Sequence, residues 1–437
     1  MKHLIKWGAL VLSTVVMLGL QSAQALDIKT WTTSNGVKVL FVESHDLPMI
    51  DVRLGFKAGS SRDGQQYGVS RLVNALLVEG TGELSAEDIA EKFESVGAEL
   101  GHNSLRDMAF VSLRSLSDKV LWEQVVDTFA RVSALPSFPQ DAIQRDRKSM
   151  LISLQNRKKE ISNVAEDSFF HNLYKNHVYE VGQHGTKPTL ESIVRDDLLH
   201  FHAKYYVANN AVLALVGDLT AEKARLYTEQ LTQYLKPGQK ADSIAPVTVE
   251  NKGQTIKIPF NTSQTHILQG IPVMARNDAD YYALYLGNHI LGGSGFSSRL
   301  MQEIRENRGL SYSVYSYFLP MESNGPFQMG LQTKNHQADE AAQLLQQMLE
   351  NFIKDGPTSE EIEHAKKNIT GSFPLKIDSN AKIVENLFVT GFYDMPLDYL
   401  DRFNANIMAV SKQDIKDAFE RRVKPEQLIR IIVGAES

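Results

Sequence analysis

One amphipathic stretch places three side chains where a metal site could form, but their residue types are wrong for it. Residues 68–81 read Gly-Val-Ser-Arg-Leu-Val-Asn-Ala-Leu-Leu-Val-Glu-Gly-Thr. The spacing of the apolar side chains predicts a helix with one buried face, and Arg71, Asn74 and Ala75 share another face. On such a face, two imidazoles one turn apart can hold zinc while a carboxylate between them activates water. A cation, an amide and a methyl group can do neither.

A second stretch, residues 299–315, carries two hydrogen-bond donors, Arg305 and Tyr312, on either side of a Gly-Leu pair. A guanidinium and a phenol are both suited to donate to a carbonyl oxygen or to an oxyanion. Two ordinary interpretations compete with this one. Arg305 could pair with an acidic neighbour on a solvated helix face, and Tyr312 could be a strand aromatic without a further role.

Both stretches resemble motifs of the M16 metallopeptidase family, which includes pitrilysin and the mitochondrial processing peptidase. The family's zinc helix has the frame Gly-Val-x-His-x-x-Glu-His-x-x-x-x-Gly-Thr. In this chain, Arg71 and Ala75 stand at the two His positions and Asn74 stands at the Glu position. The family's second-half motif, Ser-Arg-Leu-x-x-x-Ile-Arg-x-x-x-Gly-Leu-x-Tyr-Ser-Val, matches residues 298–314.

The resemblance implies a role for each matched position. The third zinc ligand of the family, a distant Glu, falls at Ser153, and residues 148–155 contain no acidic side chain. No catalytic residue, metal ligand or cofactor is therefore expected in this chain. Arg305 and Tyr312 are expected to reach an active centre from the second half or from a partner subunit and to contact substrate. Asn103 falls on the family's edge strand, where an extended peptide can pair by β-addition.

Other candidate metal and phosphate sites lack part of their chemistry. His200 and His202 lie two apart on a predicted helix, so they point to different sides and cannot chelate together. His102 and His364 have no second ligand at a suitable spacing. The glycine-rich loop 292–295 lacks the Lys-Ser/Thr of a phosphate-binding loop and follows a helix, so it indicates a tight turn.

Composition excludes several classes of protein. The chain has 437 residues, a net charge of −6 and no cysteine. This length predicts two or more domains, the charge argues against a nucleic-acid partner, and disulfides are impossible. Residues 1–25 begin with lysines, continue with an apolar run and end with Ala-Gln-Ala, which predicts a signal peptide cleaved near Ala25. The mature chain is therefore expected in the periplasm or secreted, without a transmembrane segment.

The order of the predicted elements indicates an α+β fold. A polar segment with few periodic apolar residues reads as a linker between two similar strand-helix series. The predicted organisation is a signal peptide at 1–25, an N-terminal M16-like domain at 26–234, a linker at 235–253 and a C-terminal M16-like domain at 254–437. The resemblance implies that each domain has a mostly antiparallel sheet with helices on one face, and that the two close like a clamshell.

Three functions remain open at this point. In the leading one, the chain is a non-catalytic subunit that lends Arg305 and Tyr312 to a homologue with an intact His-x-x-Glu-His, and the zinc belongs to that partner. In the second, it binds peptides or unfolded proteins as a stand-alone protein or scaffold without hydrolysing them. The third, an enzyme with another chemistry in the same chamber, requires a nucleophile or metal set that the sequence does not show.

Overall fold

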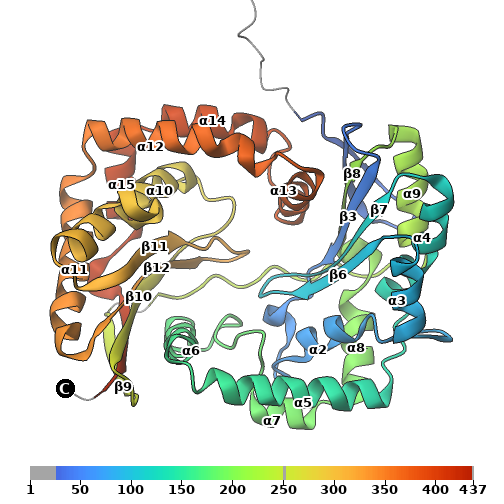
Figure 1. The fold of residues 1–437 in the computed structure, drawn as a ribbon, viewed down its shortest axis with the longest axis horizontal. Helices are drawn as coiled ribbons and strands as arrows, with labels where there is room; N and C mark the ends of the chain where they lie inside the picture. The colour runs from blue at the N-terminus through green and yellow to red at the C-terminus, as the bar shows by residue number, and fades with distance from the viewer. Residues whose placement is uncertain (1–25, 250–251, 436–437) are drawn as a thin grey trace, which may run out of the picture.

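We describe the fold from a computed structural model, which covers residues 26–249 and 252–435 (Figure 1). The molecule has two halves, each built on a β-sheet with helices packed against it. This arrangement confirms the predicted α+β class. The signal peptide predicted for residues 1–25 lies outside the described residues. Within the described part of the chain, no helix combines the length and hydropathy that a membrane crossing requires.

The first sheet lies in the N-terminal half and is mostly antiparallel. Its spatial order is β1-β2-β8-β3-β7-β6; β2 and β8 run parallel and the other neighbours run antiparallel. Strand β6 is therefore an edge strand. The strands are β1 (Lys29–Thr32), β2 (Lys38–Glu43), β3 (Met49–Phe56), β6 (Glu99–Ser104), β7 (Ala109–Leu116) and β8 (Ala211–Gly217).

The second sheet repeats this topology. Its order is β9-β13-β10-β12-β11, again with one parallel pair, β9 with β13, followed by antiparallel neighbours. Strand β11 occupies the edge position that β6 occupies in the first sheet. The shared order supports an internal duplication. The strands are β9 (Gln254–Pro259), β10 (Gln264–Met274), β11 (Ser311–Phe318), β12 (Gly325–Lys334) and β13 (Ile429–Gly434).

Amphipathic helices cover the sheets, and several begin at the side-chain caps that their sequences predict. Ser85 accepts from the backbone of Asp88 and so opens α3 with a capping box. The N-terminal half contains α2 (Val69–Leu76), α3 (Ala86–Glu94), α4 (Lys119–Ala134), α5 (Gln140–Arg157), α6 (Ile161–Leu173), α7 (Lys187–Ser192), α8 (Arg195–Tyr205) and α9 (Ala221–Thr232). The C-terminal half contains α10 (Tyr281–Asn288), α11 (Ala338–Asp355), α12 (Ser359–Ser372), α13 (Asn380–Phe392), α14 (Tyr399–Ala409) and α15 (Lys412–Arg422).

Each half lends one helix to the sheet of the other half, which differs from the expected single helical layer. Helix α13 packs on β8, β3 and β2 of the first sheet, and α6 packs on β10 and β13 of the second. The reason lies in the strands, which are apolar on both faces. Val42 and Ala214 form a cluster with Leu387 and Phe388 of α13, so this face of the sheet needs an apolar cover.

Candidate functional site

Helix α2 holds the positions at which the family's motif has its zinc ligands and base. The N-terminal end of this helix is fixed by a buried carboxylate. Asp63 accepts hydrogen bonds from the backbone of Gly68, at 2.6 Å, and of Ser70, at 3.0 Å. These contacts satisfy backbone donors of the first turn that have no partner within the helix. Burial raises the pKa of Asp63 to about 7. The helix face with Arg71, Asn74 and Ala75 is thereby held in a defined orientation.

Arg71, which stands at the first His position of the family's zinc motif, is hydrogen-bonded to a histidine. Its Nη1 lies 2.7 Å from Nδ1 of His184. Because a guanidinium can only donate, Nδ1 accepts, so the imidazole is neutral and its proton is on Nε2. Burial lowers the pKa of His184 to about 4, and the positive charges of Arg157 and Arg71 add to this effect. The contact therefore places a positive charge and a hydrogen-bonded imidazole at a position where the family's motif has a zinc-binding His.

The two other positions on this face of α2 offer no catalytic base. Asn74 is buried, its Nδ2 donates to the carbonyl of Phe110 at 3.2 Å, and its Oδ1 lies 3.3 Å from Nδ1 of His102. Both ends of the amide are thus used to join α2 to the strands β6 and β7. Ala75 adds only a methyl group, half-buried at the same face.

Ser153, which falls at the family's third-ligand position, stands on α5, a helix that packs against α2. Glu79, shortly after the end of α2, and Asp146 of α5 are acidic. Both are engaged by Arg145, at 2.6 Å and 3.2 Å. Among residues 26–249 and 252–435, no cluster of three His, Cys, Asp or Glu side chains could hold a metal ion.

Arg305 and Tyr312 form a contact pair on the other half of the molecule. The guanidinium lies 4.4 Å from the centre of the Tyr312 ring and 4.7 Å from that of Phe296, and it donates to the carbonyl of Tyr312 at 3.1 Å. Its Nε also lies 3.2 Å from Glu306, so the acidic neighbour of the simpler interpretation is present too. Tyr312 is 81% exposed. The pair is preorganised, and its phenol is open to a second molecule.

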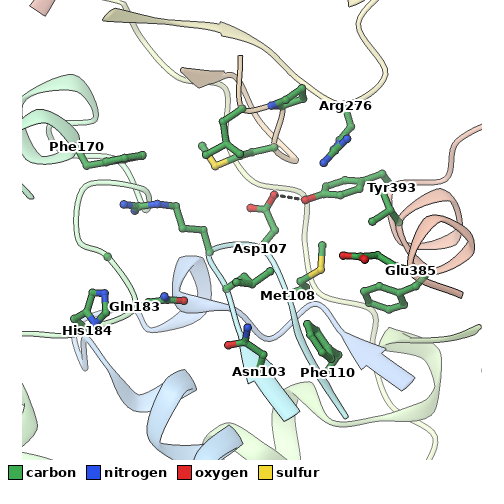
Figure 2. Close-up of a pocket in the computed structure, with 18 of the residues that line it drawn as sticks. Asn103, Asp107, Met108, Phe110, Phe170, Gln183, His184, Arg276, Glu385 and Tyr393 are labelled. Carbon is green, nitrogen blue, oxygen red and sulfur yellow. Dashed lines mark hydrogen bonds between the residues drawn. The ribbon is translucent and has the colours of Figure 1, made fainter. Parts of the chain in front are cut away.

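One cavity lies between the two halves at the end of β6 and has a volume of about 560 Å³ (Figure 2). Asn103, exposed on the edge strand β6, lines it, and so does His184, the partner of Arg71. Arg305 and Tyr312 are absent from its described lining. The charged residues of the wall are Arg53, Arg106, Asp107, Arg157, Glu166, Asp167, Arg276 and Glu385.

Asp107 joins the halves beside this cavity. Its Oδ1 accepts from the Tyr179 hydroxyl at 2.7 Å, and its Oδ2 accepts from the Tyr393 hydroxyl at 2.9 Å and from the Glu322 backbone at 2.7 Å. Tyr179 belongs to the N-terminal half, whereas the two other donors belong to the C-terminal half. Burial raises the pKa of Asp107. The three hydrogen bonds of this carboxyl group therefore connect the two halves, which is a structural role.

Comparison with known proteins agrees with this geometry. Residues 38–187 match the model described as insulinase (peptidase family M16), and residues 192–369 match the peptidase M16 inactive domain. A crystal structure of a peptidase M16 inactive domain from Pseudomonas fluorescens superposes with a TM-score of 0.92 at 38% identity, covering 94% of this chain and 98% of that one. The chain belongs to peptidase family M16.

Further relatives of this M16 chain bear different descriptions. The non-peptidase homolog YmxG of Helicobacter pylori is 28% identical over 429 residues, which is 96% of each chain. The uncharacterized zinc protease YmxG of Bacillus subtilis is 25% identical over 361 residues, covering 82% of this chain and 87% of that protein. Together with Arg71, Asn74 and Ala75 at the motif positions, these matches support an inactive M16 protein.

His184 was not predicted as a functional residue from the sequence. Two glycines, Gly68 and Gly185, permit the backbone contact that positions it. Gly68 and Gly185 have positive φ angles of 95° and 68°. A Cβ added to Gly185 would lie 2.5 Å from the Tyr67 carbonyl and 3.1 Å from Gly68 Cα. These two glycines let the loop before α7 approach the start of α2, which brings His184 to Arg71. No local sequence pattern around residues 185–186 indicates this contact with α2.

Proposed function

We propose that this chain is the non-catalytic subunit of a two-chain M16 zinc peptidase of the periplasm or exterior. In this role it lends Arg305 and Tyr312 to the active centre of a homologue with an intact His-x-x-Glu-His, which holds the zinc. The proposal rests on a difference between two parts of this chain. On α2, Arg71 is hydrogen-bonded to His184 in place of a zinc ligand. In contrast, the Arg305 and Tyr312 pair is intact and lies outside the chain's own cavity, and its Tyr312 is exposed.

The chemistry of the pair suits a substrate carbonyl that gains negative charge. The guanidinium keeps donors free beyond its bond to the Tyr312 carbonyl, and the phenol can donate a further hydrogen bond. Stacking on Phe296 and Tyr312 restricts the Arg305 side chain before substrate arrives. Donors fixed in advance stabilise a transition state more than mobile ones do.

The test uses the heterodimer reconstituted from this chain and a zinc-containing homologue that copurifies with it from its native compartment. Arg305→Ala or Tyr312→Phe should leave assembly and zinc content unchanged and lower kcat/KM. Loss of one donor to an oxyanion costs about 2.7–4 kcal/mol, or about 10²–10³ in rate. A smaller loss, mostly in KM, would show that the residue binds substrate equally in the ground state.

Matched controls lie on the same elements. Arg305 lies on a π-helical segment, Met301–Asn307, and Arg308 follows directly after this segment and pairs with Glu303. Tyr317 lies on β11 with Tyr312. Arg308→Ala and Tyr317→Phe should leave the kinetics close to wild type. If all four variants have wild-type kinetics, the Arg305 and Tyr312 pair is structural and the proposal fails.

A stand-alone peptide-binding protein is the second candidate, and the edge strand β6 favours it. This strand pairs with β7 on one side and ends at the cavity, with Asn103 exposed. An edge strand beside a cavity can take an extended peptide as an additional strand. Peptide binding by the isolated chain, without any copurifying M16 partner, would favour this candidate.

A further inference from the structure

The loop at 292–298 leads into the segment that carries Arg305, and the proposed function gives this loop no role. A 3₁₀-helical turn covers Gly295–Ser297. The buried Ser298 ties this turn to the next segment. Its backbone N–H and its hydroxyl donate to the Gly295 carbonyl at 3.0 Å and 2.7 Å, and its hydroxyl oxygen accepts from the Met301 N–H at 3.4 Å. The turn is therefore fixed to the start of the segment with Arg305.

The side chain that this turn presents to solvent is Phe296. It is 70% exposed, so packing in the hydrophobic core does not explain the position of its ring. The Arg305 guanidinium lies 4.7 Å from the centre of this ring and 4.4 Å from that of Tyr312. A guanidinium at these distances is attracted to the face of an aromatic ring. Arg305 is therefore held between its own segment and two rings that lie mostly in water.

The Phe296 ring matters because Arg305 has a competing partner. Its Nε lies 3.2 Å from the exposed carboxylate of Glu306. An ion pair between exposed side chains is weak and leaves both of them mobile. An arginine side chain also has many rotamers to lose when it binds a ligand. A ring beside the guanidinium reduces the number of these rotamers before substrate arrives, which lowers the cost of placing the donors.

We propose that Phe296 is a positioning residue for Arg305, and that its aromatic ring is required, not its apolar volume. This inference rests on the proposed function, in which Arg305 donates to substrate at a partner's zinc centre. Phe296 acts through Arg305, by keeping the guanidinium beside Tyr312. Phe296 lies outside the motif at 298–314, so it adds a residue that the motif does not contain.

The first experiment measures steady-state kinetics of the reconstituted heterodimer. Phe296→Leu keeps an apolar side chain and removes the ring, so kcat/KM should fall about twofold to thirtyfold, which is the range of a cation–π contact. Because Arg305 is proposed to act on the transition state, kcat should fall by the same factor. Phe296→Tyr keeps the ring and should retain most of the activity.

A double-mutant cycle tests whether Phe296 acts through Arg305. In an Arg305→Ala background, Phe296→Leu should cause no further loss of kcat/KM. Leu226→Ala is the control for loss of an exposed apolar side chain, because Leu226 is 58% exposed on α9 of the other half. It should leave the kinetics at the wild-type level. Size-exclusion elution and zinc content confirm that each heterodimer is assembled.

A second experiment needs no partner subunit. Crystal structures of the isolated chain and of its Phe296→Leu variant are compared, in a crystal form in which this loop touches no neighbouring molecule. In the wild type, the Arg305 guanidinium should have one position beside the Tyr312 ring. In the variant it should have several conformers or turn to Glu306.

The outcomes separate this inference from the proposed function. If Arg305→Ala leaves the kinetics unchanged, the proposed function fails, and the crystal structures alone decide whether Phe296 holds Arg305. If Arg305→Ala lowers kcat/KM but Phe296→Leu does not, the inference is overturned while the proposed function stands. The inference is also overturned if Phe296→Leu has the same effect with and without Arg305, or if the Arg305 conformer is unchanged in the variant.

Discussion

At the scale of residues, α2 and α5 together lack the zinc ligands and the catalytic base of the M16 motif. Substitutions on α2 alone should therefore not restore zinc binding or activity. The variant Arg71→His, Asn74→Glu, Ala75→His still has Ser153 on α5, and two protein ligands rarely suffice for catalytic zinc, which usually has three. We expect little zinc binding and little activity. Adding Ser153→Glu should raise the affinity for zinc measurably. Metal analysis of both variants checks this, and a triple variant as active as an intact M16 peptidase would contradict it.

His184 should make stability depend on pH with a definite sign. The pKa of its imidazole is lowered to about 4 in the folded chain from the ordinary 6.5. Between these values, the unfolded chain binds a proton that the folded chain does not. The free energy of unfolding therefore contains a contribution that is complete above pH 6.5 and is lost as pH falls toward 4, with a slope of up to about 1.4 kcal/mol per pH unit.

The variant His184→Gln tests this, because it keeps an acceptor for Arg71 and removes the titration. Urea unfolding of both proteins between pH 7 and pH 4 should show a steeper loss of stability for the wild type. Asp63, with its pKa raised to about 7, has the opposite effect but is common to both proteins. Parallel pH profiles would mean that His184 titrates normally.

At the scale of elements, α13 should contribute more to the stability of the first sheet than its position in the C-terminal half suggests. Phe388 is fully buried, and a Cβ at Gly55 of β3 would lie within 2.5 Å of its ring. Phe388→Ala should lower the free energy of unfolding by about 3–5 kcal/mol. Leu375→Ala, at a position 64% exposed, should change it by less than about 0.5 kcal/mol. Equal effects in denaturant unfolding would contradict this packing.

Sequence patterns predicted individual helices and strands better than the contacts between them. The period of the apolar side chains over residues 68–81 predicted the helix that the structure has as α2. A period shows that a face is buried but not what covers it, so the exchange of α6 and α13 was not foreseen. The contact of Arg71 with His184, 113 residues away, was missed for the same reason.

The helix that begins at Tyr281 changes its geometry before it ends. Its α-helical part, α10, ends at Asn288, and a π-helical turn covers His289–Gly293. A Cβ at Gly292 would lie 2.5 Å from the Ser316 hydroxyl of β11. Strand β11 therefore passes close to the π-helical turn at Gly292. No local sequence pattern indicates this contact. Arg305 lies on a second π-helical segment, Met301–Asn307; such segments are frequent at functional sites.

At the scale of the whole molecule, the two halves are tied by contacts from both sides. Asp107 binds donors of each half, Lys57 and Arg62 lie 2.9 Å and 3.4 Å from Glu322, and α6 and α13 are exchanged. A cavity remains between the halves, but the described residues place no metal site in it. Under the proposed function, hydrolysis takes place at the zinc of a partner chain.

The central claim is that this chain has no catalytic zinc of its own. The most direct measurement is zinc content per purified chain together with peptidase activity before and after chelation. We predict less than stoichiometric zinc and no activity that a chelator removes, because Arg71, bonded to His184, stands at a zinc-ligand position and the amide of Asn74 stands at the position of the base. One tightly held zinc per chain, with peptidase activity lost on chelation, would contradict the account.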